Sequence, residues 1–425
     1  MTIKNLILMI TVSGLAAPAF SGDAKSNTLE SSHSSKTYCK DMTYFGDVLR
    51  DSDNDRPCTI IKGDLEIDSS VTSLSNLSSI KEVRGSVYIK DLLVESLEGL
   101  DNLESIEDDL IISDNDYLTN FEGLDDLEEI GGDLVIDSNN DLKNFEGLDH
   151  LEEIGNDLLI TDNESLEDFE GFGIEDIGDD VEISGNESLE SFYRGKHHKS
   201  EFSIGDELII RDNDRLRDLD GLEELESVTE VIIEDMRRLR DLDGLEISEL
   251  QDLILRNNRD LSDISAIDGI EITRTIEIEN NSSLENIDVF GGTEELEESL
   301  IIKDNDDLES LEGLENLRIA KDILIEDNND LTSLSGLSGL EFIENDFSIV
   351  DNKDLESLDG LENLVEISDD IVIEDNDSLI NIDALQVQGF DSMEIRKNKS
   401  LCVSQEFFEQ YQDSDIKIEK NHDCE

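Results

Sequence analysis

The stretch NNDLKNFEGLDHLEEIGNDLLITDN, residues 139–163, contains one complete copy of the pattern that organises this chain. Its apolar residues first recur at every third position and then alternate with other residues; they are Leu142, Phe145, Leu148, Leu151, Ile154, Leu158 and Ile160. Recurrence at every third position suits a tightly cornered chain path better than a helix. Alternation at Leu158 and Ile160 is typical of a short strand whose alternate residues face a core.

The same frame extends over most of the 425 residues at spacings of 22 to 27 residues. The residues that end successive repeats are Ser70, Leu92, Asn115, Asn139, Asn163, Asn186, Asn213, Met236, Asn258, Asn281, Asn305, Asn328, Asn352, Asn376, Asn398 and Asn421. Each repeat supplies one strand, and stacking of consecutive strands buries a continuous core. The sequence therefore predicts an all-β, parallel β-solenoid of about sixteen rungs of 22–27 residues over residues 39–425, with a longer rung at 187–213.

Asparagine occupies thirteen of these sixteen positions, and its amide both donates and accepts hydrogen bonds. We expect the thirteen to form an internal ladder that satisfies backbone groups where each coil turns inward. A glycine recurs near another bend of the repeat, as at Gly99, Gly147 and Gly313, where it relieves a tight corner.

The two ends of the chain point to export. Residues 1–19 read as a secretory signal peptide, with Lys4, an apolar run and a small-residue site at Ala17 to Ala19. Residues 20–38 read as a flexible Ser-rich leader. The four cysteines are Cys39, Cys58, Cys402 and Cys424; four cysteines permit three pairings, and their placement favours two local disulfides, one at each end. We expect a secreted or cell-surface protein, periplasmic in a Gram-negative cell, without a membrane-inserted segment.

The formal net charge of −78 predicts repulsion of nucleic acid and of anionic membranes. Acidic residues recur six positions before the end of most repeats, and stacked like charges about 4.8 Å apart need salt or bound cations. One hypothesis is Ca²⁺ held between adjacent rungs, for which the candidate ligands are Asp109, Asp133, Asp157, Asp322, Asp346 and Asp370. The alternative is a solvated acidic face, so no cofactor is required and Ca²⁺ is possible.

Besides the asparagines and the acidic residues, a column of apolar residues is expected to point outward from the middle of the strands. Its members are Tyr88, Ile111, Val135, Leu159, Ile209, Ile232, Ile254, Ile301, Leu324 and Val372. We expect them to be exposed and to form an interface stripe, although β-branched residues also suit exposed strands for their propensity alone. The segment 192–199 is the strongly basic cluster of the chain, either a docking loop for an anionic ligand or an ordinary surface excursion.

The segment from Cys58 to Ile67, CTIIKGDLEI, resembles the opening of a receptor L domain. The repeat L-x-G-L-x-x-L-x-x-I-x-x-x-L-x-I-x-x-N is also similar to that family and to its fungal cell-wall relatives. The resemblance implies a right-handed, leucine-rich-repeat-like solenoid with disulfide-capped ends that serves ligand binding, adhesion or cell-surface architecture. The chain has no cysteine-rich module or kinase, so the resemblance does not carry receptor signalling with it.

Nothing in the sequence predicts catalysis. There is no G-x-S-x-G, H-E-x-x-H, P-loop or C-x-x-C motif, and with 110 acidic residues a pair of carboxylates has no diagnostic value. The first hypothesis is a non-catalytic recognition or adhesion protein with a protein or glycan ligand and possible self-association. The second is an envelope or matrix spacer assembled through Ca²⁺, and the third and weakest is a polysaccharide-acting β-helix enzyme.

Overall fold

A computed structural model describes residues 36–40, 42–44, 56–196, 200–411 and 415–422. Residues 37–425 form one compact unit, which contains all the elements discussed below. The predicted signal peptide (1–19) and residues 20–35 of the predicted leader lie outside the described residues.

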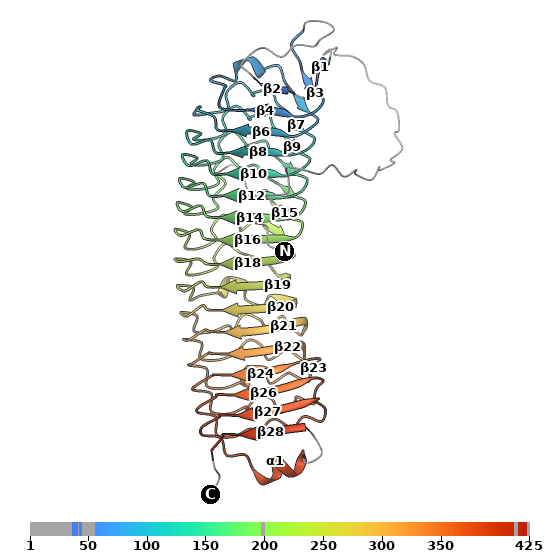
Figure 1. The fold of residues 1–425 in the computed structure, drawn as a ribbon, viewed down its shortest axis with the longest axis vertical. Helices are drawn as coiled ribbons and strands as arrows, with labels where there is room; N and C mark the ends of the chain where they lie inside the picture. Colours follow the sequence, from blue (N-terminus) through green and yellow to red (C-terminus); the bar gives the residue numbers. More distant parts are fainter. Residues whose placement is uncertain (1–35, 41, 45–55, 197–199, 412–414, 423–425) are drawn as a thin grey trace, which may run out of the picture. The chain divides into compact units, whose positions relative to one another are not determined.

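The unit is an all-β parallel solenoid of about sixteen turns, as predicted, and a long sheet of stacked strands forms one of its faces (Figure 1). Leu134 pairs in register with Leu110 of the preceding rung and with Leu158 of the following one. The strands, in stacking order, are β2 (Met42–Tyr44), β4 (Leu65–Ile67), β6 (Val87–Lys90), β8 (Leu110–Ser113), β10 (Leu134–Asp137), β12 (Leu158–Thr161), β14 (Val181–Ser184), β16 (Glu207–Arg211), β18 (Glu230–Glu234), β19 (Glu249–Arg256), β20 (Glu271–Glu279), β21 (Glu295–Lys303), β22 (Ile319–Glu326), β24 (Phe347–Val350), β26 (Asp370–Glu374), β27 (Ser392–Arg396) and β28 (Asp415–Glu419). We call this the main sheet.

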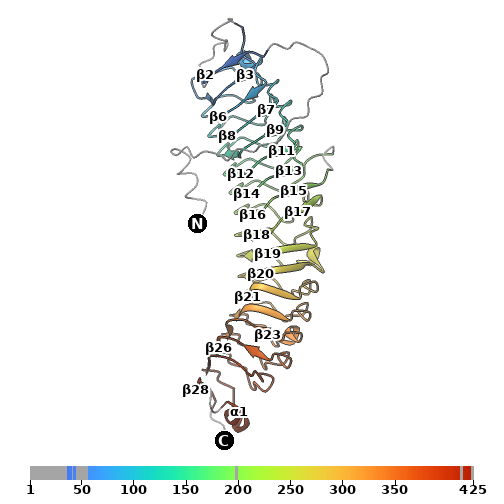
Figure 2. The same ribbon diagram turned by 90° about the vertical axis from the view of Figure 1, so that its right-hand side faces the viewer.

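A second parallel sheet corrects the prediction of one strand per rung. Nine short strands form it along the N-terminal half (Figure 2): β1 (Tyr38–Cys39), β3 (Ile60–Ile61), β5 (Glu82–Val83), β7 (Ser105–Ile106), β9 (Glu129–Ile130), β11 (Glu153–Ile154), β13 (Asp176–Ile177), β15 (Phe202–Ile204) and β17 (Leu225–Ser227). From β19 to β22 the two strands of a rung merge into one of eight or nine residues, and β23 (Phe342–Ile343) and β25 (Glu366–Ile367) are separate again. The sequence pattern hid these strands because most of them have only one inward residue, such as Ile130 or Ile154.

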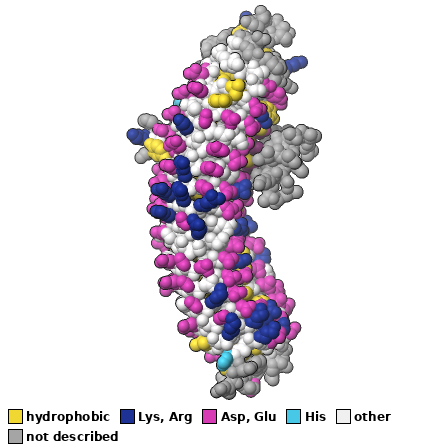
Figure 3. Space-filling model, turned by 60° about the vertical axis from the view of Figure 1, so that its left-hand side comes forward, with side chains coloured by type: hydrophobic (Ala, Val, Ile, Leu, Met, Phe, Trp, Pro, Cys, Tyr) yellow, Lys and Arg dark blue, Asp and Glu magenta, His cyan; other side chains and the backbone are white. Residues whose placement is uncertain are grey.

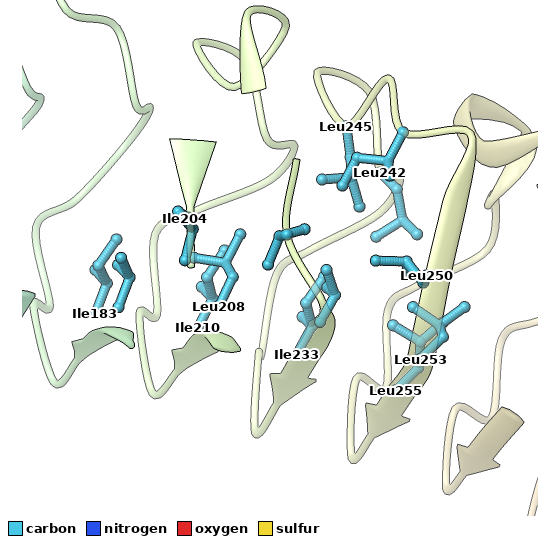
Figure 4. Packing of buried hydrophobic residues seen from close by; sticks show 14 of the residues in the cluster. Ile183, Ile204, Leu208, Ile210, Ile233, Leu242, Leu245, Leu250, Leu253 and Leu255 are labelled. Atoms are coloured by element: carbon cyan, nitrogen blue, oxygen red, sulfur yellow. The ribbon is translucent and has the colours of Figure 1, made fainter. Parts of the chain in front are cut away.

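The core lies between the walls of the solenoid and is made of the apolar residues of the repeat. Leu142, Phe145, Leu148 and Leu151 are fully buried, and each such side chain contributes about 1.5–3 kcal/mol by leaving water. Figure 4 shows the same packing further along, where Ile210, Ile233 and Leu255 point inward from successive strands of the main sheet. Because each rung packs only on its neighbours, one continuous core results.

Most rungs bend at two places where one residue has a positive φ, in the left-handed region of backbone conformation. Gly147 has a φ of 103°, and a Cβ at this position would lie 2.2 Å from the carbonyl oxygen of Phe121 on the preceding rung. Directly before the ladder position, a second residue with positive φ ends each strand; examples are Asp114 (φ 59°), Asp162 (φ 54°) and Asn257 (φ 58°). Asp, Asn and Gly tolerate this conformation best, which explains why acidic residues recur there.

Both ends of the solenoid carry disulfide-bonded cysteines. Cys39 is bonded to Cys58, as predicted. Cys402 is also disulfide-bonded, and Cys424, its predicted partner, lies outside the described residues. Within the described part of the chain the one α-helix is α1 (Gln405–Gln410), where the Ser404 hydroxyl accepts a hydrogen bond from the Phe407 amide at 3.2 Å. The sequence analysis did not predict this helix.

Candidate interaction surface

The thirteen repeated asparagines lie in one column inside the solenoid, and all but Asn421, which is half-buried, are fully buried. Each side chain forms hydrogen bonds with backbone groups of preceding rungs. In Asn139, Nδ2 donates to the carbonyl oxygen of Ile112 at 2.9 Å, while Oδ1 accepts from the backbone amide of Asn115 at 3.1 Å. Asn352 makes the corresponding bonds to Ile325 and Asn328 at 2.9 and 3.1 Å. The column is therefore a structural device and leaves the outer faces of the main sheet for binding.

Three columns of side chains point outward from the main sheet, because strand register stacks equivalent residues of successive rungs. We call them the carboxylate column, the central column and the strand-end column. On the β8 rung, their respective members are Asp109, Ile111 and Ser113. In Figure 1 the arrows of this sheet lie in front, and no described helix or strand covers them.

The carboxylate column contains the six aspartates predicted as Ca²⁺ ligands, and each of them lies on the main sheet. In five of the six, Oδ1 accepts a hydrogen bond from the backbone amide of the next rung, and in Asp370 it accepts from the hydroxyl of Ser392. Oδ1 of Asp109 accepts from the amide of Asp133 at 3.1 Å, and Oδ1 of Asp322 accepts from the amide of Asp346 at the same distance. In the described part of the chain, no group of three or more His, Cys, Asp or Glu side chains is arranged to hold a metal ion. Calcium binding stays a prediction, and backbone support accounts for these aspartates without it.

Burial raises the pKa of several members of this column. Desolvation is the main cause at Asp133, Asp157 and Asp180, and neighbouring carboxylates add to it. The effect is largest at Glu230, where desolvation and then Glu207 and Asp252 raise the pKa to about 7. Protonation of Glu230 near neutral pH therefore removes part of the repulsion from Glu207 and Asp252.

The central column contains all ten residues of the predicted apolar stripe, in register from β6 to β26. The prediction that they are exposed is wrong. Ile111, Leu159, Ile209 and Ile254 are buried, at 7 to 9% exposure, and the other six are half-buried. Stacking of parallel strands in register places each side chain against its neighbours above and below, and this removes most of its surface from water.

The stripe is also interrupted. Glu182 stands between Leu159 and Ile209, Glu277 between Ile254 and Ile301, and Ser348 between Leu324 and Val372. The longest uninterrupted apolar run is therefore Tyr88, Ile111, Val135 and Leu159, on β6 to β12.

In the C-terminal half the strand-end column alternates in charge, a feature that the sequence analysis missed. Its members from β16 to β22 are Arg211, Glu234, Arg256, Glu279, Lys303 and Glu326, which we call the charge ladder. Lys303 Nζ lies 3.8 Å from carboxylate oxygens of both Glu279 and Glu326. Reading the last residue of each strand in order would have revealed the alternation.

The charge ladder also pairs with the two glutamates of the central column. Arg256 binds Glu277 through both carboxylate oxygens, with 2.6 Å between Nη2 and Oε2. Arg211 Nε donates to Oε1 of Glu182 at 3.1 Å, whereas Oε2 of Glu182 is buried and has no hydrogen-bond partner among the described residues. Glu182 is therefore only partly satisfied.

The N-terminal half has different side chains in the same columns. Its strand-end positions from β6 to β14 hold Lys90, Ser113, Asp137, Thr161 and Ser184; Lys90 is exposed, whereas Ser113 and Thr161 are buried at 7 and 9% exposure. Beside them an open groove of about 500 Å³ runs along the turns that follow the strands, and its carboxylates come from Asp91, Asp114, Asp116, Asp162, Glu164 and Glu187. We call the apolar run of β6–β12 together with this groove the N-terminal patch.

The basic cluster of the long rung is not a uniform surface feature. Arg194 is buried, its guanidinium lies 4.4 Å from the Phe202 ring centre, and Nη1 donates to the carbonyl oxygen of Ile174 at 2.9 Å. Desolvation lowers its pKa. Residues 197–199 lie outside the described residues. Arg194 thus tightens the interior of its rung.

The fold defines an all-β parallel β-solenoid. In a comparison with protein families, residues 57–121 match the model of the Receptor L domain. The predicted resemblance is confirmed over that segment, which includes β6 and β8. No match to a curated protein was found. None of the helices in the described ranges has the length and apolarity needed to cross a membrane.

Proposed function

We propose that this chain is a secreted or cell-surface recognition or adhesion protein without catalytic activity, and that the outer face of the main sheet binds its ligand. The observation that carries the proposal is the uncovered main sheet, with apolar residues stacked in its central column between polar flanks. Patches of this composition are typical of interaction sites. Receptor L domains generally bind protein ligands and are not enzymes, which agrees with this use of the face.

The test compares the full chain with a variant in which Ile111, Ile209 and Ile301 are each replaced by Thr. Thr keeps the β-branched shape and strand propensity but replaces a methyl-bearing group with a hydroxyl. On protein and glycan arrays we expect the wild-type chain to bind defined members and the variant to lose them, with an unchanged circular dichroism spectrum. Equal binding by both chains would exclude the sheet face as the site.

Incubation with a polysaccharide panel separates recognition from turnover. A recognition protein releases no new reducing ends from any polysaccharide that it binds. Release of reducing ends would replace the proposal with an enzymatic function.

A further inference from the structure

Basic residues are distributed unevenly along the chain, and the N-terminal patch lies where they are scarcest. From Asp91 to Tyr193 the sequence has 35 acidic residues and one Lys or Arg, which is Lys143. Lys90 directly precedes this range on β6, and its Nζ lies 5.4 Å from the ring centre of Tyr88. Lys143 does not line the groove, and no Lys or Arg side chain of the described residues does. In the view of Figure 3, Asp and Glu occur along the whole face, whereas Lys and Arg gather in its middle and lower parts.

Further along the solenoid, the same turn positions hold cations that neutralise the carboxylates. Arg237 Nη1 lies 2.8 Å from Oδ2 of Asp214 on the preceding rung. Lys397 Nζ lies 2.6 Å from Glu374 and 2.9 Å from Asp375. The turns of this fold can therefore place a Lys or Arg side chain beside the carboxylates. Among the described residues, no Lys or Arg lines the groove of the N-terminal patch.

A second and independent feature marks the border of this patch. Glu182 follows Leu159 in the central column, its side chain is 5% exposed, and its Oε2 has no hydrogen-bond partner among the described residues. A buried carboxylate oxygen without a donor costs free energy. An apolar run, a carboxylate groove and a half-satisfied glutamate thus lie on adjoining rungs.

We propose that the N-terminal patch binds a basic polypeptide segment, whose Lys or Arg side chains enter the groove while its aliphatic side chains cover Tyr88, Ile111, Val135 and Leu159. This inference rests on the proposed function and specifies its partner. A cationic polypeptide matches both halves of the patch, since opposite charges steer the encounter and apolar contact stabilises the complex.

Other occupants match the patch less well. A neutral glycan leaves the groove carboxylates uncompensated. A second copy of the chain brings a further charge of −78 to an acidic surface. A divalent cation requires several oxygen ligands at one point, and no such group occurs in the described residues.

The test uses the full chain and a short fluorescein-labelled peptide in which Lys and Leu are separated by Gly. The groove variant is Asp114→Asn, Asp116→Asn and Glu164→Gln. Asn tolerates the positive φ of residue 114, and at residue 116 it keeps an acceptor for the amide of Asn140. The matched control, Asp304→Asn, Asp306→Asn and Asp327→Asn, removes the same charge at equivalent turns, and Asn329 donates to Asp306 as Asn140 does to Asp116.

By fluorescence anisotropy we expect the groove variant to bind this peptide at least about ten-fold more weakly than the wild type, and the control to stay within about two-fold. Binding should weaken as NaCl rises, and a Glu-Leu-Gly peptide should not bind. Equal losses in both variants would reveal unspecific charge attraction and overturn the inference. Absence of peptide binding would also overturn the inference. It would likewise be overturned if CaCl₂ raised the melting temperature more than NaCl at matched ionic strength, only with the groove intact, and the peptide did not bind selectively.

These outcomes are distinguishable from failure of the proposed function. If array ligands are lost in the Ile-to-Thr variant but retained in the groove variant, the sheet face still serves recognition and only the basic partner is wrong. If neither variant changes array binding, both proposals fail.

Discussion

The β6–β14 and β16–β22 stretches of the main sheet have the same pairing in register and the same buried columns but different outward side chains. Leu158 and Ile160 of β12 face the core as Leu253 and Leu255 of β19 do. Outside, Thr161 occupies the strand-end position of β12, whereas Arg256 occupies that of β19. The inward columns fix the fold and are held constant, while the outward columns vary and can be used for recognition.

The largest effect should come from the ladder, and it should be the same in both halves. Asn139→Ala removes the acceptor of the Asn115 amide and the donor to the Ile112 carbonyl, and Asn352→Ala removes the equivalent pair at Asn328 and Ile325. Each change leaves two buried backbone groups unsatisfied, so we expect a loss of about 3 kcal/mol in either half. Hydrogen exchange of the two rungs on each side measures it.

The exposed neighbour Asn140 provides the control for this prediction. Its Nδ2 donates to Asp116 at 2.7 Å on the surface, and Asn140→Ala should cost less than about 1 kcal/mol. A loss at Asn139 as small as that at Asn140, or a loss confined to one half, would contradict the claim that the core is uniform.

The fold was largely predictable because its signal repeats. The same inward positions recur in sixteen rungs, so a single exception, such as Met236 in place of the ladder asparagine, does not obscure the period. The short strands of the second sheet were not predicted, since most of them, like Glu129–Ile130, offer only one buried residue. The helix α1 lies within the last repeat, between Asn398 and Asn421, where Ser404 and Gln410 interrupt the apolar spacing of three residues.

The second prediction concerns the charge ladder, which the N-terminal half lacks. Arg256→Met leaves the carboxylate of Glu277, whose side chain is 10% exposed, without its guanidinium partner. Because Arg256 itself is partly exposed, we expect a loss of about 2 kcal/mol, below the range for fully buried pairs. Thr161→Val changes the corresponding position of β12 and removes only the hydroxyl that donates to Asp137, so it should cost about 1 kcal/mol. Urea unfolding of both variants gives the comparison.

Arg256→Lys and the double variant Arg256→Met with Glu277→Met serve as controls. Lysine keeps the charge but not the two-pronged contact, so it should recover part of the loss. Removal of both charges should recover most of it, because no buried charge is left alone. A double variant that is no more stable than Arg256→Met would show that the loss comes from packing.

The site was less predictable than the fold because outward columns depend on register and exposure together. The ten residues of the stripe lie in one column, but their burial and the interruptions at Glu182, Glu277 and Ser348 emerge only when the rungs are stacked. The acidic residues that directly follow the strands have a conformational reason in the positive φ of Asp114 and its equivalents, which the sequence alone does not reveal. Composition shows how many charges there are, and geometry shows which ones are paired.

The smallest predicted effect tests where the carboxylate column is under most repulsion. Burial and the neighbours Glu207 and Asp252 raise the pKa of Glu230 from its ordinary 4.5 to about 7. Between these two values the folded chain binds more protons than the unfolded chain, so stability at this site falls as pH rises from about 4.5 to 7. Glu230→Gln should therefore raise the free energy of unfolding above pH 7 by about 1 kcal/mol, a value reduced for the partial exposure of this side chain.

Glu234→Gln, on the same strand, is the opposite case and completes the comparison. Its carboxylate lies 3.7 Å from Arg211 and 3.9 Å from Arg256, so neutralising it removes attraction instead of repulsion and should leave stability equal or slightly lower. Thermal unfolding from pH 4.5 to 8 follows both variants. If Glu230→Gln and Glu234→Gln shift stability in the same direction at pH 8, the repulsion is a property of the total charge of the chain. Opposite shifts place it in the carboxylate column, where the charge ladder does not reach.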